Sequence, residues 1–138
     1  MSNIKYILLF LILSLIPNNM NAQTTAEEKK DMLIRISEIE IYPEYLNEYI
    51  AILKEEAEIS VNIEPGVIAI YPMQIKDNPT QIRIVEIYAN QAAYQSHLKT
   101  PHFQYYKTET LKMVKSLNLV DMTSLDEETM SKIFKKLK

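Results

Sequence analysis

Two histidines, His97 and His102, are the only side chains in this sequence whose ordinary charge change falls near neutral pH. Between them, Thr100-Pro101 predicts that one helix ends and another begins. On one continuous helix their spacing would not give a common face, but across a break they can converge. His102 would lie in a first helical turn, where free N–H groups favour a neutral imidazole that acts as base or donor. The alternative is that the two residues only end one helix and begin the next.

Glu86 and Tyr88 share one face of a predicted strand over residues 81–88, together with two isoleucines. A carboxylate on an otherwise apolar strand face must find a partner. Glu86 would either orient a histidine, as in many acid–base sites, or form an ion pair with Arg35 or Arg83. The sequence leaves both interpretations open.

Aromatic side chains are numerous for so short a chain, with nine tyrosines and three phenylalanines. Such residues often fill a core or an interface, but they can also line a pocket for a flat aromatic ligand. The side chains that we expect to contact a substrate are Tyr71, Tyr88, Phe103 and Tyr106. Both histidines with Glu86 would nominally form a facial metal triad, but their spacing does not support it, and we expect no metal.

Composition excludes several classes of protein. The chain has no cysteine, which rules out disulfides, thiolate metal sites and cysteine nucleophiles. Its only glycine, Gly66, rules out a glycine-rich phosphate loop. The formal charge of −3, with the charges interspersed, disfavours nucleic acid as a partner.

Residues 1–22 have the pattern of a secretory signal peptide. Lys5 precedes an apolar run over residues 6–16, which is shorter than a membrane span, and Pro17 and a polar segment lead to Ala22. Residues 23–32 read as a flexible polar leader. We therefore expect an exported protein, periplasmic or extracellular, without membrane attachment after cleavage.

The remaining chain predicts one domain over residues 33–122 and a terminal amphipathic helix over residues 123–138. A helix begins at Pro43, a short one covers about residues 90–98, another begins at Pro101, and Ser124 starts a capping box for the last. Strands are expected over residues 33–42, 67–73, 81–88 and 117–122. The order β-α-β-β-α-β predicts an α+β, ferredoxin-like fold.

Several of these strands are apolar on both faces. In residues 33–42 the phase changes: Ile34 and Ile36 share one face, and Ile39 and Ile41 share the other. That pattern indicates a bulge or a strand buried on both sides. Because helices cover only one face of such a sheet, the other would be a large apolar patch. We expect a second copy to cover it, giving a homodimer.

The motif around the histidines resembles a known family. Glu86-Ile87-Tyr88, followed by Ala93, His97 and the run 98–103 (LKTPHF), is similar to antibiotic biosynthesis monooxygenases, closest to quinol monooxygenase and autoinducer-2 isomerase-type members. Glu64-Pro65-Gly66 with Tyr71-Pro72-Met73 resembles the start of that family's second strand. The resemblance covers roughly residues 33–122. It implies a dimeric α/β barrel, with a pocket between sheet and helices in each subunit.

The resemblance also implies a chemistry. Several members oxidise phenols, anthrones or quinols with O₂ and without metal or flavin: a base deprotonates the substrate, and the electron-rich anion reacts with oxygen. His97 and His102 would then transfer protons and stabilise the anion, Glu86 would orient a histidine or a substrate group, and Tyr88 would supply a hydrogen bond or a stacking surface. The absence of tryptophan argues against the haem-degrading members.

We therefore expect a cofactor-independent monooxygenase-like enzyme that oxidises a small quinol or polyphenol. Two alternatives stay open at this stage. One is a dimer that binds a small ligand without turnover, and the other is an isomerase of a small hydroxy-dione, which would need no oxygen.

Overall fold

The computed structural model describes residues 31–133 of the 138-residue chain. The predicted signal peptide, most of the predicted leader and the end of the predicted terminal helix lie outside the described residues. In the part of the chain that is described, no helix combines the length and the apolar character that crossing a membrane requires.

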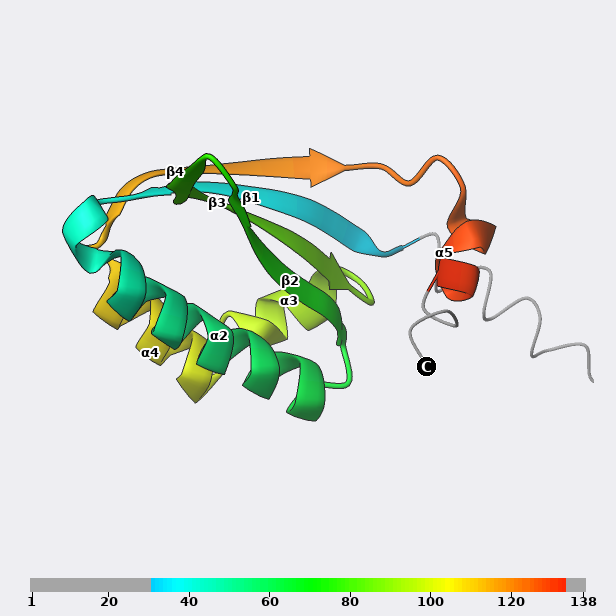
Figure 1. Cartoon of the computed structure of the whole chain (residues 1–138). Coiled ribbons are helices and arrows are strands. Elements are labelled where there is room, and N and C mark those ends of the chain that lie inside the picture. The colour runs from blue at the N-terminus through cyan, green and yellow to red at the C-terminus, as the bar shows by residue number, and fades with distance from the viewer. Residues whose placement is uncertain (1–30, 134–138) are drawn as a thin grey trace, which may run out of the picture.

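The described chain forms two layers, a four-stranded sheet and a layer of helices on one of its faces (Figure 1). All neighbouring strands are antiparallel, in the order β2-β3-β1-β4. The predicted ferredoxin-like fold is confirmed. The elements in chain order are β1 (Leu33–Ile41), the 3-10 helix η1 (Pro43–Tyr45), α2 (Leu46–Ile63), β2 (Val67–Ile75), β3 (Asn78–Tyr88), α3 (Gln91–His97), α4 (Pro101–Thr110), β4 (Val114–Met122) and α5 (Glu127–Ile133).

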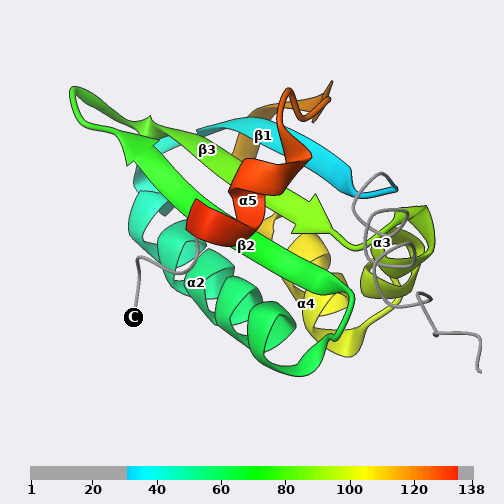
Figure 2. The ribbon, with the colours of Figure 1, turned by 90° about the vertical axis from the view of Figure 1, so that its right-hand side faces the viewer.

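The core lies between the sheet and the helix layer, where α2 and α4 run side by side (Figure 2). Tyr49 and Leu53 come from the apolar stripe of α2 and are buried against the inner face of the sheet. The central cluster consists of Ile39, Ile41, Tyr49, Leu53, Ile82, Ile84 and Met113.

The changing apolar phase of β1 reflects a strand with two partly buried faces. Its register with β3 is unbroken from Leu33 to Glu40, and the register with β4 shifts only between Glu40 and Ile41. Ile39 and Ile41 are buried on the helix side, whereas Ile34 and Ile36 alternate to the other face and are half-buried. Of the two predicted alternatives, a strand partly buried on both faces fits the structure, and the one irregularity in the pairing of β1 lies at its end.

Two caps fix the joint between α3 and α4. The Asn90 side chain accepts a hydrogen bond from the Ala93 N–H at the start of α3, and Thr100 Oγ1 accepts one from the Phe103 N–H at the start of α4. Pro101 occupies the first turn of α4, where its missing N–H costs nothing. The predicted helix break is confirmed.

Some element boundaries differ from the sequence-based expectation. The β2–β3 turn is confined to Lys76-Asp77, and β4 begins at Val114, three residues earlier than expected. The side chain that accepts the first N–H bonds of α5 is Asp126, not Ser124, through the Glu128 and Thr129 N–H groups. Figure 1 shows α5 beyond the end of β4, away from the helix layer.

The contact between Gly66 and Ala93 shows how tightly α3 packs against the start of β2. A Cβ at this position would lie 2.5 Å from the Ala93 Cβ, far inside the normal contact distance. We expect Gly66→Ala to lower the free energy of unfolding by about 1–3 kcal/mol, as overpacking usually does. Urea denaturation of the variant against the wild type measures the change.

The matched control is Ala93→Gly in the Gly66→Ala background. It removes the opposing methyl group and should recover part of the loss, although glycine in a helix itself costs about 1 kcal/mol. A Gly66→Ala variant as stable as the wild type would show that this contact relaxes freely.

Candidate active site

A cavity of about 350 Å³ lies between the inner face of the sheet and helices α2, α3 and α4. This is a common size for a small-molecule site. Most of its wall surface is apolar, and its polar side chains include two cations, Arg35 and Lys107. The apolar wall includes Ile39, Leu53, Ile70, Ile84, Leu98 and Leu119.

Five of the seven residues predicted for the site line this cavity. They are Glu86, Tyr88, His97, Phe103 and Tyr106. The structure does not place Tyr71 with them: on β2, Ile70 faces the cavity and the next side chain points to the opposite face, where Tyr71 is 64% exposed. His102 also lies outside the cavity wall and faces two shallower surface hollows.

Glu86 forms a polar group on the sheet side of the cavity. Its carboxylate accepts hydrogen bonds from Ser37 Oγ at 2.5 Å and from the Tyr88 hydroxyl at 2.9 Å. Burial raises the pKa of the Tyr88 phenol, and the nearby charge of Glu86 raises it further. Tyr88 therefore stays protonated and remains a donor at neutral pH.

The sequence predicted a histidine or an arginine as the partner of Glu86, and the structure corrects this. The hydrogen bonds of the Glu86 carboxylate come from Ser37 and Tyr88 instead. Arg35 lies opposite Glu86 in the β1–β3 register, but its guanidinium turns to Asp121 on β4 at 2.7 Å. Arg83 points to the other face of β3, where it pairs with Glu38 at 3.6 Å.

The two histidines do converge, but on a residue that the sequence did not single out. His97 Nδ1 lies 3.0 Å from Glu64 Oε1, and His102 Nε2 lies 2.5 Å from the same oxygen. Burial alone would raise the pKa of Glu64, but the hydrogen bonds from His97 and His102 outweigh it and leave the pKa below its ordinary value. Glu64 is therefore a carboxylate at neutral pH.

The other ring nitrogen of His97 faces a second carboxyl group. His97 Nε2 lies 3.6 Å from Glu56 Oε1, and Glu56 accepts a hydrogen bond from Ser60 Oγ at 2.7 Å. Glu56 is 5% exposed, and burial raises its pKa, with only partial compensation from Ser60. Glu56 and His97 both line the cavity, which places an acid–base pair in its wall.

Aromatic rings fix the His97 imidazole against the cavity. Its ring centroid lies 4.7 Å from that of Phe103 and 5.3 Å from that of Tyr88. Across the cavity wall the hydroxyls of Tyr49 and Tyr106 share a hydrogen bond of 2.7 Å, and burial raises the pKa of Tyr106 to about 12. These phenols are neutral at physiological pH.

Sequence reasoning missed Glu56 and Glu64, although a signal existed for one of them. Glu56 lies three residues after Leu53, inside the buried stripe of α2 rather than on its charged face. A carboxylate on a buried stripe marks a candidate site. Glu64 stands in the Glu64-Pro65-Gly66 break after α2, and nothing in its spacing points to the histidines.

One donor set in the described part of the chain could hold a metal. It consists of Glu64, His97 and His102, whose ligand atoms lie within 4.8 Å of one another. This differs from the nominal set with Glu86. Two imidazoles and a carboxylate suit a transition metal by type, but such an ion would have to replace the hydrogen bonds that join these three side chains.

Known proteins similar to this chain share its fold. A solved structure from Bacteroides thetaiotaomicron, a presumed antibiotic biosynthesis monooxygenase, is 49% identical, with a TM-score of 0.70 over 71% of this chain and 93% of that one. A presumed monooxygenase from Lactobacillus acidophilus is 31% identical, with a TM-score of 0.67 over 68% of this chain and 45% of that one. A presumed antibiotic biosynthesis monooxygenase from Nitrosomonas europaea, 18% identical, has a TM-score of 0.65 over 70% and 92% and supports the fold alone.

Among curated proteins, no sequence matches this chain. Residues 32–109 match the family described as antibiotic biosynthesis monooxygenase, which is more than half of the sequence. The resemblance inferred from the motif around the histidines is thereby confirmed, and the chain belongs to the antibiotic biosynthesis monooxygenase family.

Proposed function

We propose that this protein oxidises a small quinol or polyphenol with O₂ inside the cavity between sheet and helices. The observation that carries the proposal is an apolar cavity whose wall holds an acid–base pair, His97 and Glu56, and a separate hydrogen-bonding group, Glu86 with Tyr88. Such a cavity suits a ligand of one or two aromatic rings. The two polar groups suit its hydroxyls.

Glu86 and Tyr88 would anchor one substrate hydroxyl. The carboxylate oxygens of Glu86 each have a second lone pair beyond the bonds from Ser37 and Tyr88, so they can accept from a phenol O–H. An acceptor of this kind favours a hydroxyl-bearing substrate, while Arg35 and Lys107 also line the wall and offset the negative charge of Glu86.

His97 would remove the proton of the other hydroxyl. A hydrogen on Nδ1 is directed at Glu64, which leaves a lone pair on Nε2, and the 3.6 Å to Glu56 is too long for a hydrogen bond. The anion formed is rich enough in electrons to react with O₂. In the overall reaction, hydroquinone plus O₂ gives hydroxybenzoquinone plus water, so the substrate supplies all the electrons and no cofactor is needed.

The direct test is oxygen uptake with a panel of hydroquinones. His97→Gln should lower kcat by about 10²–10⁴, the usual range for loss of a general base, and Tyr88→Phe should raise KM through the lost anchor. Tyr42→Phe, on an exposed tyrosine outside the cavity, serves as the matched control and should keep wild-type rates. The same rates after dialysis against EDTA would support catalysis without a metal.

Three results would contradict the proposal in different ways. Equal rates in wild type and His97→Gln would remove His97 from the mechanism. Binding without product would indicate a ligand-binding dimer. Conversion of a hydroxy-dione without oxygen uptake would indicate an isomerase that uses the same base.

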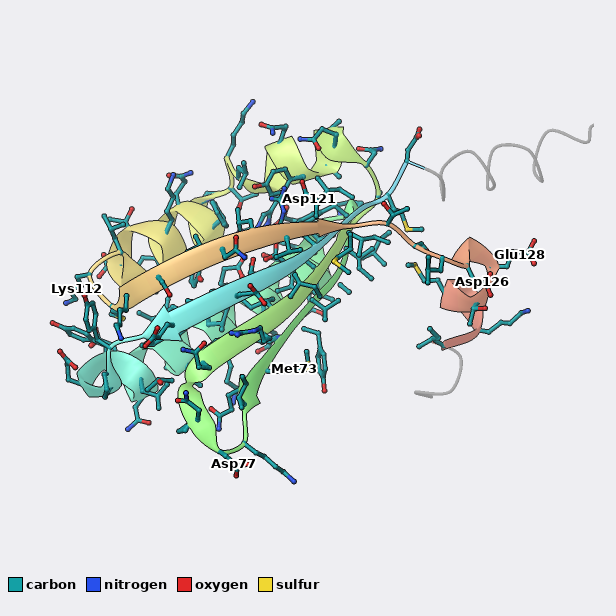
Figure 3. The ribbon with its side chains drawn as sticks, turned by 90° about the horizontal axis from the view of Figure 1, so that it is seen from above. Met73, Asp77, Lys112, Asp121, Asp126 and Glu128 are labelled. Atoms are coloured by element: carbon teal, nitrogen blue, oxygen red, sulfur yellow. The ribbon has the colours of Figure 1, made fainter. Side chains whose placement is uncertain are left out.

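We also propose that the outer face of the sheet binds a second copy of the chain. All four strands present apolar side chains on this face, seen from above in Figure 3, where Met73 is labelled. They are half-buried or exposed: Ile34, Ile36, Tyr71, Met73, Val85, Val120 and Met122. A patch as wide as the sheet suits an identical partner, because a two-fold interface pairs a surface with itself.

Light scattering of residues 23–138 at micromolar concentration should give twice the mass of one chain. Met73→Lys combined with Val120→Lys places two charges on the outer face and should shift the protein to the monomer. Asp77→Lys, on the β2–β3 turn, is the control and should leave the mass unchanged. A monomeric wild type would reject the proposed dimer.

We further propose that the protein is exported, on the strength of residues 1–22 alone. Expression of the full chain in a bacterium should then deliver a processed protein outside the cytoplasm. Its N-terminal residue, read by mass spectrometry, should be Gln23. Recovery of the uncleaved chain in the cytoplasm would contradict this.

A further inference from the structure

We propose that Glu64 is the positioning residue of His97 and that Glu64, held by His102, passes the substrate's proton out to a surface groove. This inference rests on the proposed function for the origin of the proton. The part of the proposal in which Glu64 positions His97 concerns the ligand-free protein and can be tested without any substrate.

Glu64 lies between two different spaces in the protein. On one side is His97, 2% exposed, which lines the cavity. On the other side Glu64 and His102 both line a groove on the surface, together with Ser96 and Thr100. The side chain of Glu64 is 12% exposed, so water in this groove can reach it. Glu64 thus connects the cavity histidine to solvent without passing through the cavity.

The hydrogen bonds fix which nitrogen of His97 carries the proton. A carboxylate oxygen only accepts, so His97 Nδ1 and His102 Nε2 must both donate to Glu64 Oε1. With its hydrogen on Nδ1, a neutral His97 has its lone pair on Nε2. This nitrogen lies 3.6 Å from Glu56 Oε1, and both residues line the cavity. If Glu64 were absent, the hydrogen could move to Nε2, and the base would then be blocked.

The backbone holds Glu64 in place between the histidines. Glu64 follows the last residue of α2, its N–H donates to the Ser60 carbonyl, and its own carbonyl accepts from the Val67 N–H. The His97 carbonyl accepts from both the N–H and the hydroxyl of Thr100, which ties the end of α3 to the start of α4. Three helix ends are thereby fixed around one carboxylate, as a positioned base requires.

The proton balance of the step is simple. The substrate O–H bond breaks and a new N–H bond forms at His97 Nε2, while the Nδ1 hydrogen moves to Glu64 Oε1. Glu64 then releases that proton to water in the groove and becomes a carboxylate again, because His102 continues to donate to it. The net result is a substrate anion in the cavity, one proton in solvent and a neutral His97 whose hydrogen is on Nε2. When oxygen is reduced, that hydrogen passes to it, and Nδ1 regains a hydrogen from the groove through Glu64, which restores the resting tautomer.

Two variants of Glu64 separate positioning from proton transfer. Glu64→Gln keeps an oxygen that accepts from His97 Nδ1 but cannot take up a proton at neutral pH. Glu64→Ala removes both abilities. Glu58→Gln, on the exposed face of α2, is the matched control. Urea denaturation of each variant establishes that it is folded before it is compared.

The first readout is the ¹⁵N NMR spectrum of ligand-free, histidine-labelled protein. Wild type, Glu58→Gln and Glu64→Gln should show His97 with its hydrogen on Nδ1, and Glu64→Ala should show at least partial transfer of that hydrogen to Nε2. A His97 hydrogen on Nε2 in the wild type, or an unchanged spectrum in Glu64→Ala, would overturn the positioning role. Neither outcome depends on whether the protein oxidises quinols.

The second readout is the kinetics of oxygen uptake. Both Glu64 variants should lower kcat by about 10² with little change in KM, because the contacts that hold the substrate remain. Formate should restore part of the kcat of Glu64→Ala, since the groove admits a small carboxylate. A Glu64→Gln enzyme with wild-type kcat, or no rescue by formate, would overturn the proton path.

The two proposals fail in distinguishable ways. A wild type that oxidises no quinol, yet shows the expected His97 tautomer and its loss in Glu64→Ala, would reject the proposed oxidation and keep Glu64 as the positioning residue. A wild type that is active, with both Glu64 variants equally active, would keep the oxidation and reject the role of Glu64.

Discussion

The candidate site depends on one shared carboxylate. Glu64 accepts a hydrogen bond from His97 at the end of α3 and from His102 in the first turn of α4, while its own backbone ends α2. A carboxylate of such low exposure is costly unless its oxygens are paired, and two imidazole N–H groups supply that pairing. The geometry of three helix ends, and with it the wall of the cavity, follows from satisfying this one group.

The sheet contributes the opposite wall by a different principle. Alternation along β3 directs Ile82, Ile84, Glu86 and Tyr88 to the helix side, so that two polar groups end a row of apolar ones. Glu86 finds its donors within the sheet, from Ser37 on β1 and from Tyr88 two residues along the same strand. The anchor is therefore fixed by the sheet and the base by the helices, and a substrate would lie between two independently held groups.

Local signals made much of this arrangement predictable. Asn90, Thr100 and Pro101 define the α3–α4 joint through side chain and backbone chemistry that the sequence displays directly. Strand alternation alone would also have separated Tyr71 from Ile70. The partners of the histidines were not predictable in the same way, because His97 and His102 lie 33 and 38 residues from Glu64. Packing of α2 against β2 and α4, rather than any spacing, decides that Glu64 rather than Glu86 meets them.

The pKa values of the two carboxyl groups on either side of His97 are shifted in opposite directions. Burial raises the pKa of Glu56 on the cavity side, whereas hydrogen bonds from both histidines hold the pKa of Glu64 below its ordinary value on the groove side. When the surroundings of two neighbouring titratable groups push their pKa values apart, one group is suited to act as acid and the other as base. A Glu64 of low pKa orients the Nδ1 hydrogen and gives up a proton readily to water. A Glu56 of raised pKa takes up a proton more readily than an ordinary carboxyl, beside the cavity where reduced oxygen would need one.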